Sequence, residues 1–194
     1  GSEMCIRDRR QVFEAMKESR MVWLSYHSFR RITGSRTLVA PYFVKLFRQR
    51  WYVVGLPAGE RRIKTYALDR VTSLELSDRT FVYPEGFEPA DYFKDCFGIT
   101  YGEQPAEEVV LRVSALQANY LRTLPLHESQ VESERGDSHS VFRYRLKITP
   151  DLVQELYALS FWQAEVLAPQ SLREAVAARL AESLAGYRGP LSKR

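Results

Sequence analysis

Hydrophobic and polar positions alternate most regularly between Arg48 and Val71. Two short apolar and aromatic runs are joined there by a Pro-Ala-Gly-Glu turn, and successive side chains of a strand point to opposite faces, so the segment predicts a β-hairpin. In its first strand Trp51 and Val53 share one parity, whereas Arg50 and Tyr52 share the other. We expect aromatic rings and cations to share a face, which suits stacking on a planar group while an anion is neutralised. A plain hairpin with core aromatics and solvated arginines fits the same pattern.

The segments around this hairpin complete a small all-β module. Pro41 interrupts one long apolar run and indicates an edge, a bulge or a bend, because proline cannot donate to a strand ladder. An amphipathic helix is predicted before the strands, from the spacing of its apolar residues. Five short strands with tight turns in about sixty residues are typical of a small closed barrel. The predicted segments are a helix at 9–19, strands at 21–28, 37–47 and 71–76, and a basic loop at 29–36.

The chain changes character after this module. Residues 83–105 are rich in Pro, Gly and aromatics and predict a linker with one helical turn at 90–96. Its six aromatic residues indicate that it docks on a surface, because disordered linkers contain few aromatics. Beyond it, strands and helices alternate in the order β-α-β-β-α-β-α, which predicts a ferredoxin-like layer with a terminal helix. The strands are expected at 108–113, 129–134, 140–148 and 164–167, and the helices at 115–123, 151–160 and 171–187.

Local sequence signals indicate where one of these helices begins and which side of another is apolar. Thr149 and Pro150 fit the N-cap and first helical position of the second helix. In the first helix, Leu116, Tyr120 and Leu124 are spaced to form one apolar side. The predicted fold class is therefore α+β, with domains at 1–82 and 106–187, a linker at 83–105 and a tail at 188–194.

Composition and charge limit the class of protein and the kind of partner that the sequence allows. The 194 residues are 45% hydrophobic and 27% charged, as in soluble globular proteins. The net charge of +4 is unevenly distributed: residues 20–82 carry +8 and residues 83–194 carry −4. A basic module predicts a negatively charged partner. No apolar run approaches the roughly 20 residues needed to span a bilayer, and no signal-peptide pattern is present, so we expect a cytoplasmic protein without membrane contact.

The residues that usually carry catalysis show no organised pattern. The three His and two Cys lack metal-ligand spacing, and Cys5 and Cys96 are too far apart to indicate a disulfide framework. Neither a phosphate-cradling glycine motif nor a nucleophile elbow occurs. We therefore expect no enzyme activity, no cofactor and no metal.

Short phrases along the chain resemble a known family. The sequence has PYF at 41–43, WYVVG at 51–55 and YALDRV at 66–71, which resembles the WYL-domain family of bacterial transcriptional regulators. Val53 replaces the Leu of the family name. LPLH at 124–127 and VLAP at 166–169 resemble the C-terminal extension that follows WYL domains. The resemblance covers about residues 9–187.

The resemblance implies a fold and a role. The family fold is a five-stranded Sm-like (SH3-type) barrel that senses an effector, usually downstream of a winged helix-turn-helix that binds duplex DNA. No such motif precedes Gln11, so we expect contact with duplex DNA only through a domain absent from this chain. Family members bind anions, single-stranded DNA among them, through a basic and aromatic pocket. The positions that match the family pattern, together with cationic and aromatic residues near them in the sequence, make up the predicted ligand-binding set. It consists of Tyr26, His27, Arg50, Trp51, Tyr52, Arg62, Lys64, Tyr66 and Arg70.

Arg70 is the strongest of these candidates. Its planar guanidinium can hold a phosphate with two hydrogen bonds and keeps its charge at any working pH. Asp69 could orient it, although an ion pair that closes the barrel would also explain Arg70. For Trp51, a buried structural role is the alternative to stacking. Ala67 stands where many family members have a second Arg, which removes one expected ligand contact.

Three functions remain open from the sequence. The first is a transcription-regulating sensor of single-stranded nucleic acid or a nucleotide, and the second is a sensor of a small phosphorylated metabolite. The third is a dimerisation or protein-interaction module, in which the acidic half of one copy pairs with the basic half of another. A homodimer is expected. Its aromatic anchors would be Tyr92, Phe93, Phe97, Phe161 and Trp162.

Overall fold

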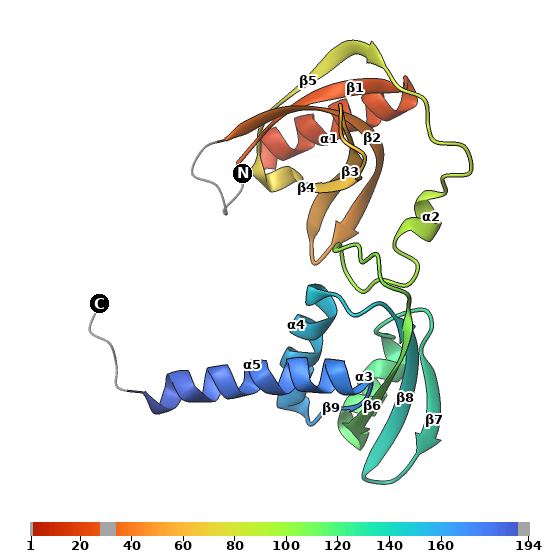
Figure 1. Ribbon diagram of the computed structural model, residues 1–194, viewed down its shortest axis with the longest axis vertical. Helices are drawn as coiled ribbons and strands as arrows, with labels where there is room; N and C mark the ends of the chain where they lie inside the picture. Colours follow the sequence, from red (N-terminus) through yellow and green to blue (C-terminus); the bar gives the residue numbers. More distant parts are fainter. Residues whose placement is uncertain (1, 28–33, 190–194) are drawn as a thin grey trace. The chain divides into compact units, whose positions relative to one another are not determined.

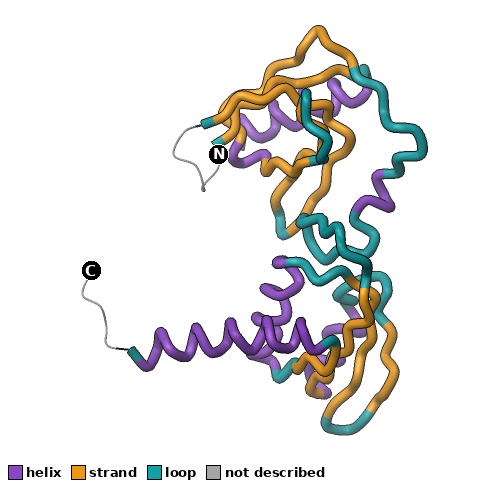
Figure 2. The backbone as a smooth tube through the Cα atoms, viewed as in Figure 1, coloured by secondary structure: helices purple, strands orange, loops and turns teal. Residues whose placement is uncertain are grey.

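The computed structural model describes residues 2–27 and 34–189, with side chains from Arg10 onward, and divides the chain into two compact units, 1–92 and 93–194. Most of the predicted basic loop at 29–36 lies outside the described residues. The predicted linker at 83–105 is shared between the two units. Figure 2 shows that strands dominate the first unit, whereas strands and helices alternate in the second.

The first unit contains one antiparallel sheet with the strand order β4-β3-β2-β1-β5 (Figure 1). The five predicted strands are therefore confirmed. The finer description as a closed Sm-like barrel is not confirmed, because the hydrogen-bonded order places β4 and β5 at opposite edges, joined in sequence by η1. The elements are α1 (Ser2–Lys17), β1 (Arg20–Tyr26), β2 (Ser35–Phe47), β3 (Arg50–Pro57), β4 (Lys64–Ala67), η1 (Leu68–Arg70), β5 (Val71–Thr80) and α2 (Pro89–Tyr92).

Helix α1 covers one face of this sheet. Val12 and Ala15 are fully buried and pack in one core with Val22 and Leu24 of β1 and Val53 of β3. These strand residues alternate along their strands, so their side chains share one face. The apolar positions of the sequence therefore decide which face of the sheet the helix covers.

The proline in β2 produces the predicted bulge. The register of β2 against β3 shifts between Pro41 and Phe43. Proline has no backbone N–H to donate, so an extra residue at this point removes the need for the missing hydrogen bond. The sequence-based expectation of a bulge or bend at Pro41 is confirmed.

The first part of the predicted aromatic linker packs on the opposite face of the sheet. The ring centroid of Tyr42 lies 5.8 Å from that of Phe81, 5.4 Å from that of Tyr83 and 5.1 Å from that of Phe87. The hydroxyl of Tyr83 donates to the carbonyl of Tyr42 at 2.9 Å. This cluster explains why the segment is rich in aromatics, and its docking was anticipated from that composition.

The second unit is a four-stranded antiparallel sheet with the order β7-β8-β6-β9 and three helices of nine or more residues. The element order is the one predicted, and the ferredoxin-like description remains an interpretation of that order. The elements are β6 (Glu107–Ser114), α3 (Ala115–Thr123), β7 (Val131–Arg135), β8 (His139–Leu146), α4 (Pro150–Leu159), η2 (Ser160–Trp162), β9 (Glu165–Ala168) and α5 (Gln170–Arg188).

Helix α4 begins as its sequence predicts. The hydroxyl of Thr149 accepts a hydrogen bond from the backbone N–H of Leu152 at 3.3 Å, and Pro150 occupies the first helical position. Helix α3 has the predicted bounds, and the apolar side noted in its sequence faces solvent. Leu116, Tyr120 and Leu124 are 58%, 60% and 79% exposed. The buried residues of α3 are Gln117, Ala118 and Leu121. Both sides of α3 carry residues at helical spacing, and the side with Gln117, Ala118 and Leu121 is the one that packs on the sheet.

An ion pair joins α3 to the edge strand β7. The Nε of Arg122 donates to the carboxylate of Glu132 at 3.0 Å, and its Nη2 donates to the hydroxyl of the buried Ser140 at 3.1 Å. The hydrogen bond from Arg122 lowers the pKa of Glu132 to about 2. The ionised form of Glu132 is therefore stabilised in the folded protein.

We expect this ion pair to make the second unit sensitive to acid. The pKa of Glu132 is lower in the folded than in the unfolded chain. The contribution of the ion pair to the free energy of unfolding is therefore complete above about pH 4.5 and is lost as the pH falls towards 2. Glu132→Gln should cost roughly 1 kcal/mol of unfolding free energy at pH 7 and nothing near pH 2. Urea unfolding of both proteins across this range measures the difference. A difference that stays constant with pH would contradict this assignment.

Candidate ligand-binding site

Three of the predicted ligand-binding residues meet in the first unit, and we call them the tyrosine–arginine cluster: Tyr26, Tyr66 and Arg70. The two phenol rings meet edge to face, with centroids 5.4 Å apart and planes at 86°. The guanidinium carbon of Arg70 lies 5.4 Å from the centroid of the Tyr26 ring. This is the geometry of a cation–π contact. The cluster therefore joins a permanent positive charge to two aromatic rings.

The local fold fixes the positions of these side chains. Tyr26 ends β1, Tyr66 lies in the edge strand β4, and Arg70 ends η1. Leu68, only 2% exposed, anchors η1 in the core. The backbone N–H of His27 donates to the carbonyl of Arg70 at 3.0 Å, which holds the end of β1 beside η1. The cluster is therefore set by backbone contacts as well as by its side chains.

Burial keeps both phenols neutral. It raises the pKa of Tyr26 above its ordinary value, although the charge of Arg70 acts in the opposite direction. Burial also raises the pKa of Tyr66, and the nearby carboxylate of Glu60 adds to the effect. Protonated phenols can donate hydrogen bonds. At physiological pH Tyr26, which keeps part of its surface, can thus offer a hydroxyl donor together with the guanidinium to an anion, whereas Tyr66 is only 8% exposed and supports the ring of Tyr26.

Two other predicted cations have acidic neighbours. The Nε of Arg50 lies 3.6 Å from a carboxylate oxygen of Asp69, and the Nζ of Lys64 lies 2.6 Å from one of Glu60. Asp69, which we expected beside Arg70, thus forms an ion pair with Arg50. Sequence reasoning missed Glu60, because the turn between β3 and β4 brings it to Lys64 and an i,i+4 spacing predicts an ion pair only within a helix. These exposed ion pairs reduce the positive charge that Arg50 and Lys64 offer a ligand.

The two aromatics of the family motif have mainly structural roles. Tyr52 is only 7% exposed, so it offers no free ring face, and Trp51 is half-buried against the core under α1. The β3–β4 register pairs Tyr52 with Ala67 and Val53 with Tyr66. Because directly paired residues share a face, Tyr52 and Tyr66 lie on opposite faces of the sheet. A cation and a ring do share a face within each strand, Arg50 with Tyr52 and Lys64 with Tyr66, but the register places these two pairs on opposite faces of the hairpin.

The remaining two predicted residues are exposed. His27 follows the end of β1, and Arg62 lies in the loop between β3 and β4. Both can reach solvent from the first unit. The sequence-predicted set thus consists of the three clustered residues, two cations paired with acids, two structural aromatics and two exposed polar side chains.

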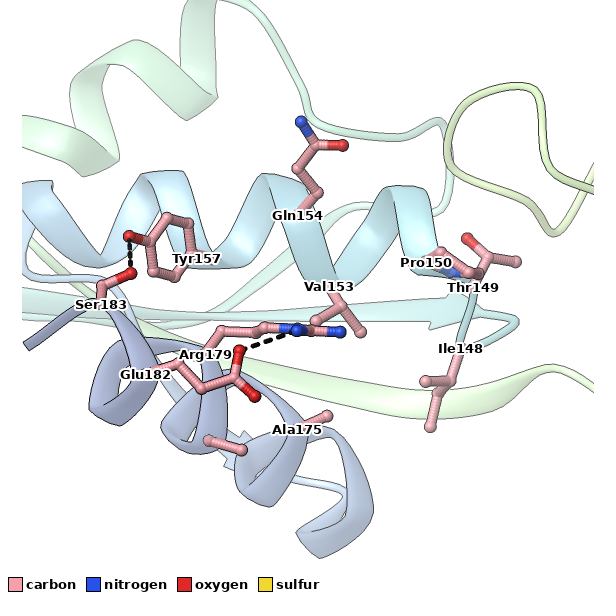
Figure 3. A pocket seen from close by; sticks show the side chains of 11 residues that line it. Ile148, Thr149, Pro150, Val153, Gln154, Tyr157, Ala175, Arg179, Glu182 and Ser183 are labelled. Atoms are coloured by element: carbon pink, nitrogen blue, oxygen red, sulfur yellow. Dashed lines mark hydrogen bonds and ion pairs between the residues drawn. The ribbon is translucent and has the colours of Figure 1, made fainter. Parts of the chain in front are cut away.

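The second unit contains a separate groove of about 770 Å³ between α4 and α5 (Figure 3). Val153 and Tyr157 of α4 line it opposite Ala175 and Arg179 of α5. The hydroxyls of Tyr157 and Ser183 lie 2.7 Å apart across it, and Arg179 forms an ion pair with Glu182 at 2.8 Å. None of its lining residues belongs to the predicted ligand-binding set, which lies in the first unit.

The described residues form neither a metal-binding cluster nor a membrane-spanning helix. Residues 2–27 and 34–189 contain no group of three or more His, Cys, Asp or Glu side chains placed to hold a metal ion. In the same part of the chain, no helix has the length and apolar character required to cross a membrane.

Comparison with known families agrees with the sequence phrases. The model of the WYL domain matches residues 9–76, and the model of the WCX domain matches residues 105–184, so together they cover most of the chain. The chain therefore belongs to the WYL-domain family, with a WYL domain followed by a WCX domain. The tyrosine–arginine cluster lies within the WYL domain, and the groove between α4 and α5 lies largely within the WCX domain.

Two solved structures are similar to this chain. Proteasome accessory factor B/C (PafBC) of Arthrobacter aurescens is 21% identical, with 97% of this chain and 28% of that one covered at a TM-score of 0.42. A CRISPR Cas-related protein is 12% identical, with 95% of this chain and 53% of that one covered at a TM-score of 0.53. The chain thus spans about half or less of the length of these structures. No curated protein matches the sequence.

Proposed function

We propose that this chain is the ligand-sensing part of a transcriptional regulator, and that its WYL domain binds single-stranded nucleic acid or a nucleotide at the tyrosine–arginine cluster. The observation that carries the proposal is the position of Arg70, whose guanidinium lies over the ring of Tyr26 with its Nε buried. A partly desolvated guanidinium attracts a phosphate more strongly than a fully hydrated one, because the effective dielectric constant is lower.

The rings beside Arg70 favour a ligand that carries a base as well as a phosphate. Tyr26 retains part of its surface, and its ring lies directly against the guanidinium. Base stacking on an aromatic ring beside a backbone-binding cation is the usual way in which proteins hold single-stranded nucleic acid. The charge of +8 between residues 20 and 82 would attract such a ligand to this unit.

Binding of labelled single-stranded DNA, followed by fluorescence anisotropy at two salt concentrations, tests the proposal. Arg70→Gln should weaken binding about tenfold to a hundredfold, since a hydrogen-bonded charge is worth about 1.5–3 kcal/mol. The affinity of the unaltered protein should fall as salt rises, because bound counterions are released. Unlabelled mononucleotides added as competitors distinguish recognition of a nucleotide from recognition of a strand.

The matched control is Arg79→Gln, which removes the same charge from an exposed position on β5. Strand β5 begins beside η1 at Val71, and Arg79 lies eight residues further along it. We expect Arg79→Gln to change the affinity about twofold or less, through long-range electrostatics only. Equal losses from both variants would show that net charge, and not the cluster, holds the ligand. If the unaltered protein binds neither DNA nor nucleotides, the proposal is wrong.

A further inference from the structure

A carboxylate of the first unit already occupies a cation beside the tyrosine–arginine cluster. The Nζ of Lys64 lies 2.7 Å from one carboxylate oxygen of Glu60 and 2.6 Å from the other. The two oxygens of Glu60 thus take the place on this ammonium that two oxygens of a phosphate would take. Both residues are exposed, so a ligand can reach the pair from solvent.

The loop between β3 and β4 holds Glu60 in this position. The backbone N–H of Glu60 donates to the carbonyl of Pro57 at 3.1 Å, which closes the turn that follows β3. On the other side of Glu60, the half-buried Ile63 packs against the core that contains Tyr42. Because the loop is anchored on both sides of Glu60, its fold directs the carboxylate to Lys64 at the start of β4.

Lys64 extends the tyrosine–arginine cluster into a row, which we call the β4 row: Lys64, Tyr66, Tyr26 and Arg70. Lys64 and Tyr66 are two residues apart on the edge strand β4, so their side chains share a face and lie about 7 Å apart. The ring centroids of Tyr66 and Tyr26 are 5.4 Å apart, and the guanidinium carbon of Arg70 lies 5.4 Å from the centroid of Tyr26. The β4 row therefore has two rings in the middle and a cation at each end.

The charges that act on the two phenols give the same order. Beyond the effect of burial, the charge of Arg70 lowers the pKa of Tyr26, whereas the carboxylate of Glu60 raises the pKa of Tyr66. Hydrogen bonds between a cation and a phosphate are only about 2.8 Å long. A ligand with one phosphate on Arg70 therefore leaves the ion pair of Lys64 and Glu60 intact.

We propose that the ligand is a nucleotide chain whose phosphates contact both ends of the β4 row, and that Glu60 is its internal competitor at Lys64. This inference rests on the proposed function of the cluster. One phosphate of the chain binds Arg70 while a base stacks on the ring of Tyr26. A second phosphate replaces the carboxylate of Glu60 on Lys64, and the carboxylate turns to solvent.

The exchange at Lys64 is energetically accessible because one anion replaces another and because exposed ion pairs are weak. It opposes the binding of a chain, which must displace Glu60, but not the binding of a mononucleotide, which has no second phosphate. Glu60 thus sets the concentration of strand to which the site responds without changing its response to free nucleotides.

Binding of two probes tests the inference: a labelled, 5′-phosphorylated hexathymidylate by fluorescence anisotropy, and thymidine 5′-monophosphate by titration calorimetry. Glu60→Gln should tighten binding of the hexamer about twofold to fivefold, since an exposed ion pair changes an equilibrium by about this factor. Lys64→Gln should weaken the hexamer and reduce the slope of log affinity against log salt concentration by about 0.7, because one phosphate contact is lost. Neither variant should change the affinity for the monophosphate. The double variant should bind the hexamer as Lys64→Gln does, because Glu60 then has no cation to occupy.

Glu75→Gln is the matched control, because it removes an exposed carboxylate from another ion pair of the same unit, with Arg36 at 2.9 Å, and it should leave both affinities unchanged. Circular dichroism of every variant confirms that the first unit remains folded. If Glu60→Gln tightens both probes equally, or tightens the hexamer even in the double variant, Glu60 does not compete at Lys64. If both probes bind and Lys64→Gln leaves the hexamer unchanged, the nucleotide chain is overturned as the ligand, whereas the proposed function stands. If the unaltered protein binds neither probe, the proposed function and this inference both fail.

Discussion

Gly55→Ala is expected to destabilise the first unit by about 3 kcal/mol, at the upper end of the cost of overpacking a core. A Cβ at this position would lie 2.3 Å from the carbonyl oxygen of Ala40 and 2.9 Å from a methyl group of Val39. The closest obstacle is backbone of the paired strand β2, which cannot rotate away as a flexible side chain can. Relief of the clash requires β3 to move from β2 near the bulge at Pro41.

Chemical denaturation followed by circular dichroism measures this loss, and hydrogen exchange locates it in residues 20–80. Gly34→Ala is the matched control in the same unit, because a Cβ there would meet only the carbonyl oxygen of Tyr26, at an ordinary contact distance of 3.7 Å. The control should change the unfolding free energy by about 1 kcal/mol or less. Equal effects of the two substitutions would refute the role assigned to the close approach at Gly55.

Phe142→Ala is expected to cost the second unit about 3–5 kcal/mol, the usual range for removing a buried aromatic ring. Phe142 lies on the inner strand β8, is only 1% exposed and pairs directly with the fully buried Leu111 of β6. Leu152 of α4 and Leu172 of α5 belong to the same core. Removal of the ring therefore leaves a cavity that several elements would have to move to fill.

Urea unfolding of the second unit measures this cost. The matched control is Leu124→Ala, which also removes a large apolar side chain, but from a position that is 79% exposed. It should change the unfolding free energy by about 0.5 kcal/mol or less, as surface substitutions do. If Phe142→Ala also costs less than about 1 kcal/mol, Phe142 does not hold this core together.

Much of the fold could be predicted from sequence because local signals agree with the tertiary structure. The alternation in β3, the missing donor of Pro41 and the hydroxyl cap of Thr149 act within a few residues, so they operate wherever the segment lies in the fold. The element order of the second unit followed from such signals. Within the site, Arg70 and Tyr66 could be selected because cations and rings are visible in the sequence.

Relations between segments were decided only by the tertiary structure. Whether Tyr52 and Tyr66 share a face depends on the register of β3 against β4, and a shift of one residue would reverse it. The partner of Asp69 depends on where η1 meets β3, and the exposed side of α3 depends on packing against the sheet. The sequence by itself determined the elements and the chemistry that each carries. Only the packed structure decided which side chains meet, because these contacts join residues that are distant in the chain.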